Sequence, residues 1–169
     1  MAAIGRAVDV LSRDLASVPL KLLDYTNPEE PEEVLEHPAL ELLAWVNPID
    51  TPSLWWGCVY ADLVTSGDHF SWIARGADGL PGGLVRLPPE QMHVEPDPRL
   101  LIGGYWYVTT QGERVWLDVR DVVHMRTRNL QSPFRGMALL NRLRDQILVE
   151  REMRRWNLNR FKNNVPATL

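Results

Sequence analysis

The sequence predicts an α+β fold in which small N-terminal helices pack on an antiparallel meander sheet and one long C-terminal helix follows. Three observations support this prediction. Apolar residues recur at helical spacing before residue 67, the period changes to two between residues 69 and 126, and helix-forming residues follow Gly136. The chain has 169 residues, of which 45% are hydrophobic, so it is long enough to bury a core of its own.

The N-terminal segment begins with an amphipathic helix that ends before Pro19. Four apolar residues recur at steps of three and four and should lie on one face: Ile4, Val8, Leu11 and Leu15. A short strand is expected over residues 20–23. Residues 26–33 hold two prolines and four glutamates, so the sequence predicts a mobile acidic loop there.

Two further helices are predicted before the period changes. The first covers residues 38–46, and the second starts at Thr51-Pro52, where threonine is a good N-cap and proline suits the first helical turn. The second helix should stop at Gly67. Its inward residues are expected to be Trp55, Cys58 or Val59, and Leu63. Cys58 is the one cysteine, so it can form no internal disulfide, and we expect a buried and inert thiol.

Residues 69–126 read as short strands separated by turns rich in glycine and proline. The predicted strands cover residues 69–75, 83–87, 91–95, 105–110, 114–117 and 121–126. Aromatic residues fit the half-buried surface of a strand, so they are expected to cover one face of the sheet rather than to stack on bases; these are Tyr105, Trp106, Tyr107 and Trp116.

The sequence offers little that resembles catalytic or cofactor chemistry. It contains no glycine-rich phosphate loop, no nucleophile elbow and no metal-binding pair of cysteines or histidines, so we expect no catalytic, cofactor-binding or metal site. Its four histidines are scattered singly, and a lone histidine in a strand is most often a hydrogen-bonded structural residue. No apolar run is long enough for a membrane span and no signal peptide is recognisable, so no membrane partner is expected.

Charge is distributed unevenly along the chain. Residues 126–162 hold ten bases and three acids, whereas residues 1–125 hold eight bases and nineteen acids, so the formal charge of −4 conceals balances of +7 and −11. Such asymmetry points to a polyanion or an acidic partner surface. The candidate basic residues for such a contact, with DNA or with a neighbouring subunit, are Arg144, Arg151, Arg154, Arg155, Arg160 and Lys162. Ordinary pairing of arginine with glutamate on a solvated helix remains an equally open reading for Arg151, Arg154 and Arg155.

The predicted C-terminal helix covers residues 137–163 and is too long for a domain of this size to bury. One apolar stripe runs through Leu139 or Leu140, Leu143 and Ile147, and the pattern then resumes on a rotated stripe. This shift is typical of a helix that leaves its own domain and packs on a neighbouring subunit. The candidate intersubunit residues are Val149, Met153, Trp156 and Phe161.

The order of motifs resembles the N-terminal part of the portal proteins of tailed phages, in the branch found in long-tailed phages, prophages and gene-transfer particles. The resemblance extends over nearly all of the chain and rests on order and spacing rather than on one motif. The matching pieces are Ala7-Val8 with Val18-Pro19-Leu20, His37 to Leu43 with Asn47-Pro48 and Thr51, Gly67 to Ile73, Leu84 to Pro89 with Met92-His93-Val94, Asp121 to Arg126, Gly136, and Phe161 to Pro166. The serine that the family usually has after its glycine is missing at Met137.

The resemblance implies a division of the chain into a wing-like α+β domain (1–126), a linker turn (127–136), a long stem-like helix (137–163) and the start of a clip segment (164–169). It implies a structural, non-enzymatic ring subunit, in twelve copies, at the capsid vertex of a virion assembled in the bacterial cytoplasm. The implied partners are other copies, the terminase motor, capsid and head-completion proteins, and double-stranded DNA in transit through a tunnel without sequence preference. The candidate basic residues would then face the DNA in this tunnel or a neighbouring subunit. Family members are more than twice as long, so a fragment is expected.

A different class of function also fits the basic helix. The chain could be a stand-alone nucleic-acid-binding or protein-interaction module, which would bind DNA as a monomer with a steep dependence on salt.

Overall fold

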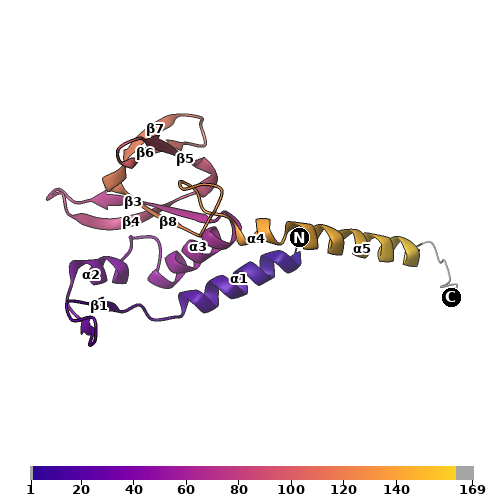
Figure 1. The fold of residues 1–169 in the computed structure, drawn as a ribbon, viewed down its shortest axis with the longest axis horizontal. Coiled ribbons are helices and arrows are strands. Elements are labelled where there is room, and N and C mark those ends of the chain that lie inside the picture. Colours follow the sequence, from indigo (N-terminus) through magenta and orange to yellow (C-terminus); the bar gives the residue numbers. More distant parts are fainter. Residues whose placement is uncertain (1, 163–169) are drawn as a thin grey trace.

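The structure, a computed structural model, describes residues 2–162 and contains an α+β domain from which one helix projects (Figure 1). The helices and strands, with two short 3-10 turns, are α1 (Ala2–Ala16), β1 (Leu22–Asp24), β2 (Glu32–Val34), α2 (Pro38–Ala44), α3 (Pro52–Thr65), β3 (Asp68–Arg75), β4 (Pro81–Leu87), η1 (Pro89–Gln91), β5 (Met92–Asp97), β6 (Leu101–Val108), β7 (Arg114–Asp118), η2 (Val119–Asp121), β8 (Val122–Arg126), α4 (Leu139–Arg142) and α5 (Arg144–Lys162). We call residues 2–126 the N-terminal domain and residues 127–136 the linker. The predicted α+β class is confirmed.

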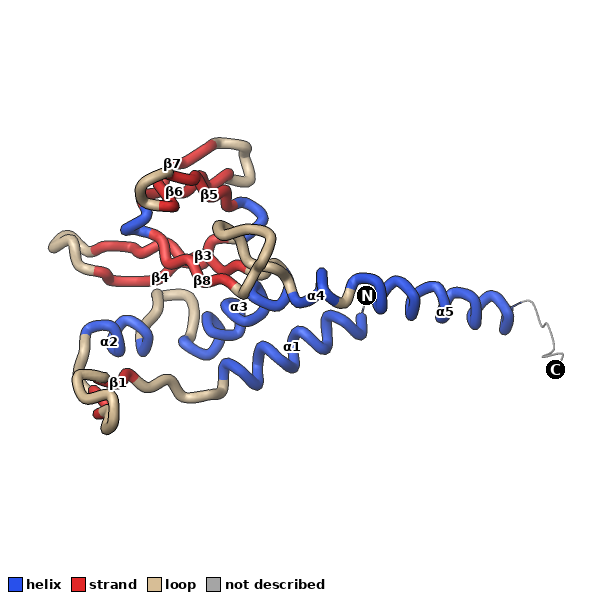
Figure 2. The backbone as a smooth tube through the Cα atoms, viewed as in Figure 1, coloured by secondary structure: helices blue, strands red, loops and turns tan. Residues whose placement is uncertain are grey.

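The N-terminal domain has three layers (Figure 2). Helices α1, α2 and α3 form one layer, the sheet β4-β3-β8 forms the middle layer, and the sheet β5-β6-β7 covers the other face of the middle sheet. All pairings are antiparallel. The single meander that the sequence predicts is therefore two sheets, because β8 returns to pair with β3 instead of extending the row β5-β6-β7.

Helix α3 forms as the sequence predicts. The Thr51 side chain accepts a hydrogen bond from the Leu54 N–H (3.3 Å), Pro52 occupies the first turn, and Gly67 ends the segment with a positive φ of 84°. Trp55 and Val59 are buried, as predicted. Cys58 is half-buried rather than buried, because it lies beside the groove between α1 and α3.

Two N-terminal predictions need correction. Leu11 and Leu15 of α1 are exposed. The face turned toward α3 carries Ile4, Val8 and Ser12 instead, which are spaced four residues apart and therefore lie on one side of the helix. The acidic segment 26–33 is not simply a loop. Its last residues belong to β2, which pairs with β1 in the register Leu22 to Val34, and Lys21 bonds Glu33 across this hairpin (2.7 Å).

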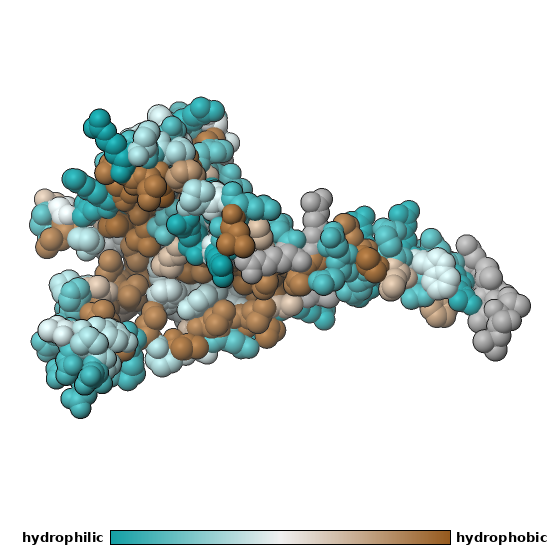
Figure 3. All heavy atoms as spheres, viewed as in Figure 1, coloured by the Kyte–Doolittle hydropathy of each residue, from teal (hydrophilic) through white to brown (hydrophobic). Residues whose placement is uncertain are grey.

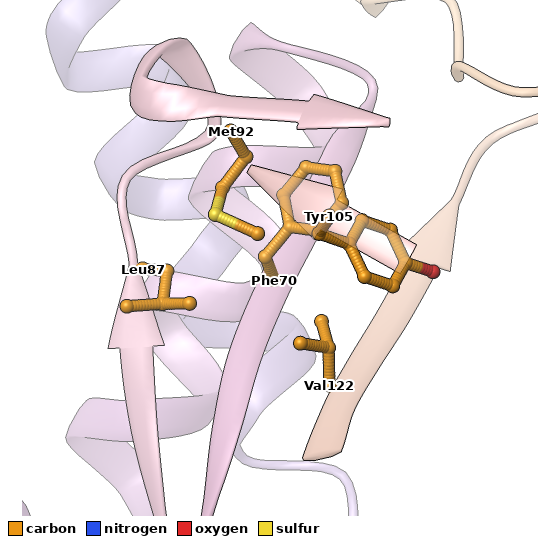
Figure 4. Close-up of a cluster of buried hydrophobic side chains, with 5 residues drawn as sticks. All are labelled: Phe70, Leu87, Met92, Tyr105 and Val122. Atoms are coloured by element: carbon orange, nitrogen blue, oxygen red, sulfur yellow. The ribbon is translucent and has the colours of Figure 1, made fainter. Parts of the chain in front are cut away.

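Strand β3 lies at the centre of the domain and is covered on both faces. On one face Phe70 packs in a cluster between the two sheets, with Leu87, Met92, Tyr105 and Val122 (Figure 4). On the other face, a second cluster joins Val46, Trp55, Val59 and Leu84 beneath the sheet. Alternate residues of a strand point to opposite faces, so four consecutive buried residues require cover on both sides.

The C-terminal helix is shorter than predicted and is interrupted. It starts at Leu139 rather than at residue 137, because Ala138 is extended (ψ 136°) and the Thr127 hydroxyl bonds both the N–H and the carbonyl of Met137. At Leu143 the backbone leaves helical geometry (φ −99°, ψ 3°), and α5 continues from Arg144 to Lys162. Residues 163–169, which include the end of the predicted helix and the expected clip segment, lie outside the described residues.

Replacement of Phe70 by alanine should destabilise the N-terminal domain by about 3–5 kcal/mol, because a buried phenylalanine leaves a cavity between the two sheets. Urea unfolding monitored by tryptophan fluorescence measures the change. The control is Trp72→Ala in the same strand, whose side chain is exposed; it should cost less than about 2 kcal/mol. Equal losses would contradict the layer arrangement.

Candidate assembly helix and buried polar networks

Helix α5 carries an apolar face that is more than half exposed. Val149, Met153 and Trp156 recur at steps of four and three, and these residues are 54%, 63% and 60% exposed. The Arg160 guanidinium lies over the Trp156 ring at 5.2 Å, which places Arg160 on the same side of the helix. We call Val149, Met153 and Trp156 the apolar face of α5.

A second face of α5 is basic. Arg151, Arg155 and Lys162 are exposed and share the side opposite the apolar face, since they are separated by four and seven residues. We call these three residues the basic face. Arg154 lies between the two faces and forms an exposed ion pair with Glu150 (2.9 Å), which is the ordinary pairing that the sequence left open.

Two further predicted site residues, Phe161 and Arg144, are not among the residues of either face. Phe161 is 82% exposed but lies five residues after Trp156, so it is turned about 140° from Trp156 and lies beside the apolar face rather than within it. Arg144 is described in its backbone alone, and its side chain lies outside the described part of the chain. The structure thus brings Val149, Met153, Trp156 and Arg160 together and separates Phe161 from them.

The position of α5 explains its exposure. It has 19 residues and extends about 28 Å at about 1.5 Å per residue, and it projects away from the three layers (Figure 1). Figure 3 shows brown apolar residues among teal hydrophilic residues along this projection. Exposed apolar surface of this kind marks a site of interaction, because water contact with it is unfavourable.

A buried polar network lies between α3 and the middle sheet. His69 bonds Asp62 through Nδ1 (2.9 Å) and Ser71 through Nε2 (2.8 Å), and Arg86 Nε donates to Asp62 (2.8 Å). The order Asp, His, Ser is that of a hydrolase triad. Here Ser71 and His69 are fully buried, so the hydroxyl cannot reach a substrate. This confirms the prediction that His69 is a hydrogen-bonded structural residue.

A second buried network surrounds Asp68 at the start of β3. Its carboxylate is 1% exposed and contacts His124 Nε2 (3.0 Å), the Gly136 N–H (2.7 Å) and Arg135 Nε (2.7 Å). Burial acts to raise the pKa of Asp68, but the hydrogen bonds from His124 and Gly136 and the charge of Arg135 outweigh it, so the pKa lies below its usual range. The carboxylate therefore joins the linker to the N-terminal domain as an anion.

Other candidate chemistry is limited in the part of the chain that the structure describes. Burial raises the pKa of the Cys58 thiol, which disfavours the reactive thiolate. Among residues 2–162, no cluster of three histidine, cysteine or acidic side chains is placed to hold a metal ion. No described helix has the length and apolar character that crossing a membrane requires.

Sequence reasoning missed the Asp68 network. Asp68 comes directly after the turn at Gly67, and Arg135 lies 67 positions after Asp68. No periodic pattern connects residues so far apart in the sequence. One signal was present: a lone charged residue at the start of a strand buried on both faces requires a partner. The partner itself could not be named from that signal.

A small layered domain that holds a half-apolar helix clear of its own core has the architecture of an assembly subunit. The family model described as phage portal protein matches residues 2–169. The chain therefore belongs to the phage portal protein family, as the resemblance implied. A comparison with curated proteins finds no match.

Solved structures share this fold. The neck of an empty GTA particle computed with C6 symmetry contains a chain that is 18% identical, with a TM-score of 0.76 over 98% of this chain and 43% of that one. The neck of a native GTA particle computed with C12 symmetry gives 16% identity, a TM-score of 0.76, and 98% and 42% coverage. An HK97 family phage portal protein from Corynebacterium diphtheriae is 19% identical, with a TM-score of 0.62 over 98% of this chain and 49% of that one. The chain thus spans less than half the length of these relatives.

The Asp68 carboxylate should make stability depend on pH. Its pKa is lower in the folded than in the unfolded state, so its stabilisation is present above the usual aspartate range, about pH 4, and is lost as pH falls through the folded pKa. Asp68→Asn should cost about 1–3 kcal/mol at pH 7 and progressively less below about pH 4. Urea unfolding from pH 7 to pH 3 measures this difference.

The control for this pH series is Asp121→Asn, which removes the exposed ion pair with Arg75. Its cost should be about 0–1 kcal/mol. A cost of Asp68→Asn that stays constant down to pH 3 would contradict the role of the buried anion.

Proposed function

We propose that this chain acts as a structural ring subunit at the capsid vertex of a phage-like particle, through which DNA is packaged and ejected. In this proposal residues 1–126 form the wing, 127–136 the linker turn and 137–163 the stem helix, and residues 164–169 begin the clip segment. The role is structural rather than catalytic. Membership in the phage portal protein family supports the proposal.

The exposed apolar face of α5 is the observation that carries this proposal. A helix face with Val149, Met153 and Trp156 more than half exposed gains stability when another chain covers it. In a head-to-tail contact the covered surface differs from the covering surface, and repetition by a fixed rotation closes a ring. The neck structure described with C12 symmetry supports a ring of twelve copies.

The basic face of α5 suits DNA in transit. Arg151, Arg155 and Lys162 are exposed on the side opposite the apolar face, so both faces can be used at once. Contact with moving DNA requires phosphate electrostatics without base reading, because the helix must release each phosphate. The acidic excess of residues 1–125 opposes DNA binding by a single copy.

The same proposal assigns the other partners. A ring at the vertex meets the terminase motor during packaging, the surrounding capsid, and head-completion proteins afterwards. The virion is the proposed location, after assembly in the cytoplasm of the bacterial host. Particle structures among the relatives support a virion component.

Substitution of both Met153 and Trp156 by serine should weaken self-association, because it removes most of the apolar face of α5. Sedimentation velocity over a concentration series measures the effect, which should exceed tenfold in the association constant.

The matched control is Leu158→Ser, which removes an apolar side chain of similar exposure, 54%, from another side of α5. It should leave association within about twofold of the original chain, since it lies two residues and about 200° from Trp156. Equal weakening by both variants would contradict an interface on the apolar face.

The alternative of a stand-alone DNA-binding module is tested by salt dependence. We expect little affinity of the 169-residue chain for duplex DNA at physiological salt and no sequence preference. At low salt, replacing Arg151 and Arg155 by serine should reduce the slope of log affinity against log salt by about 1.8, at about 0.9 for each lost phosphate contact. Fluorescence anisotropy measures both, with Arg114→Ser as the control. Tight, sequence-selective binding would overturn the portal proposal.

A further inference from the structure

The end of the linker is held against the N-terminal domain by an arginine that contacts three separate places. The Arg135 Nε lies 2.7 Å from the Asp68 carboxylate. Its two terminal nitrogens donate to backbone carbonyls, one to Met92 (2.7 Å) and one to Pro89 (3.2 Å), and the guanidinium lies 5.3 Å from the centre of the Phe70 ring. One side chain thus contacts the middle sheet and the start of the sheet β5-β6-β7.

The backbone next to Arg135 is equally close to the domain. A Cβ atom on Gly136 would collide with the Gly67 carbonyl oxygen, and one on Gly67 would lie 2.6 Å from the Ala138 nitrogen. The Gly136 N–H donates to Asp68. Only glycines allow two backbones to approach this closely, so the linker is seated in one position.

Thr127, at the other end of the linker, bonds the same segment beside Gly67. Its N–H donates to the Gly67 carbonyl (2.8 Å). Its hydroxyl donates to the Met137 carbonyl (2.7 Å) and accepts from the Met137 N–H (3.0 Å). The residues that precede α4 are therefore bound to the start of β3 from both ends of the linker.

We infer that Arg135 is a positioning residue that fixes the direction in which the C-terminal helix leaves the N-terminal domain. Its planar guanidinium presents several donors in a rigid fork, so one side chain sets both distance and angle. Beyond Ala138, α4 has four residues and α5 projects from the domain. The linker thus sets where α4 begins, and α4, which also contacts α3, leads into α5.

This inference goes beyond the proposed ring function and does not depend on it, because it concerns one chain. Spin labels on cysteines placed at Val85 in β4 and Gln146 in α5, with Cys58 replaced by serine, report the distance between domain and helix. The labelled chain is diluted in excess unlabelled chain, so that contacts between copies do not contribute. Pulsed electron paramagnetic resonance gives the distance distribution.

Arg135→Met should at least double the width of this distribution or move its mean, while amide exchange in the central part of β3 stays slow. Arg135→Lys keeps the positive charge near Asp68 but loses the fork, and should give an intermediate width. Gly136→Ala keeps Arg135 and displaces the linker through backbone contact, so it should move the mean distance.

The matched control is Arg75→Met. Arg75 also pairs one carboxylate, Asp121 (2.9 Å), and donates to two carbonyls, of Gly79 (3.2 Å) and Arg120 (2.9 Å), but it lies away from the linker. Its distribution should match that of the original chain. A folded Arg135→Met protein with the same distribution as Arg75→Met would overturn the inference. If Arg135→Met loses slow exchange in β3, an unchanged distribution in Arg135→Lys overturns it instead.

Discussion

The burial of both faces of β3 is the constraint on which the rest of this structure depends. Phe70 faces the sheet β5-β6-β7, whereas His69 and Ser71 face α3, so the strand can exist only between two layers. Polar residues in that position need internal partners, and Asp62 and Arg86 supply them on the helical side. The strand thus determines where the helices and the second sheet lie.

The same strand connects the domain to the projecting helix. Asp68 begins β3 inside the domain, and its carboxylate meets residues from β8 and from the end of the linker. Removing the partners of a buried carboxylate leaves an uncompensated charge and is strongly destabilising, so the linker is held where the strand begins. Helix α5 then leaves the domain with its apolar face largely exposed, as the proposed contact between copies requires.

The sequence predicts an element correctly where interactions between neighbouring residues determine its ends. Thr51, Pro52 and Gly67 bound α3 as predicted, since capping and left-handed backbone depend on neighbouring residues. The strands lie within a few residues of their predicted ranges, and α5 exposes Val149, Met153 and Trp156 as the rotated stripe indicated. The sequence did not predict the interruption at Leu143 or the burial of Ser12, and the burial of Ser12 depends on which face of α1 meets α3.

The sequence by itself determined the α+β class, the two charge regions, the long amphipathic C-terminal helix and the family resemblance, because composition, periodicity and motif order are properties of the chain. Only the tertiary structure decided that the strands form two sheets and that Arg135 meets Asp68. These facts depend on residues far apart in the chain, and a buried charge specifies that it needs a partner without specifying which one.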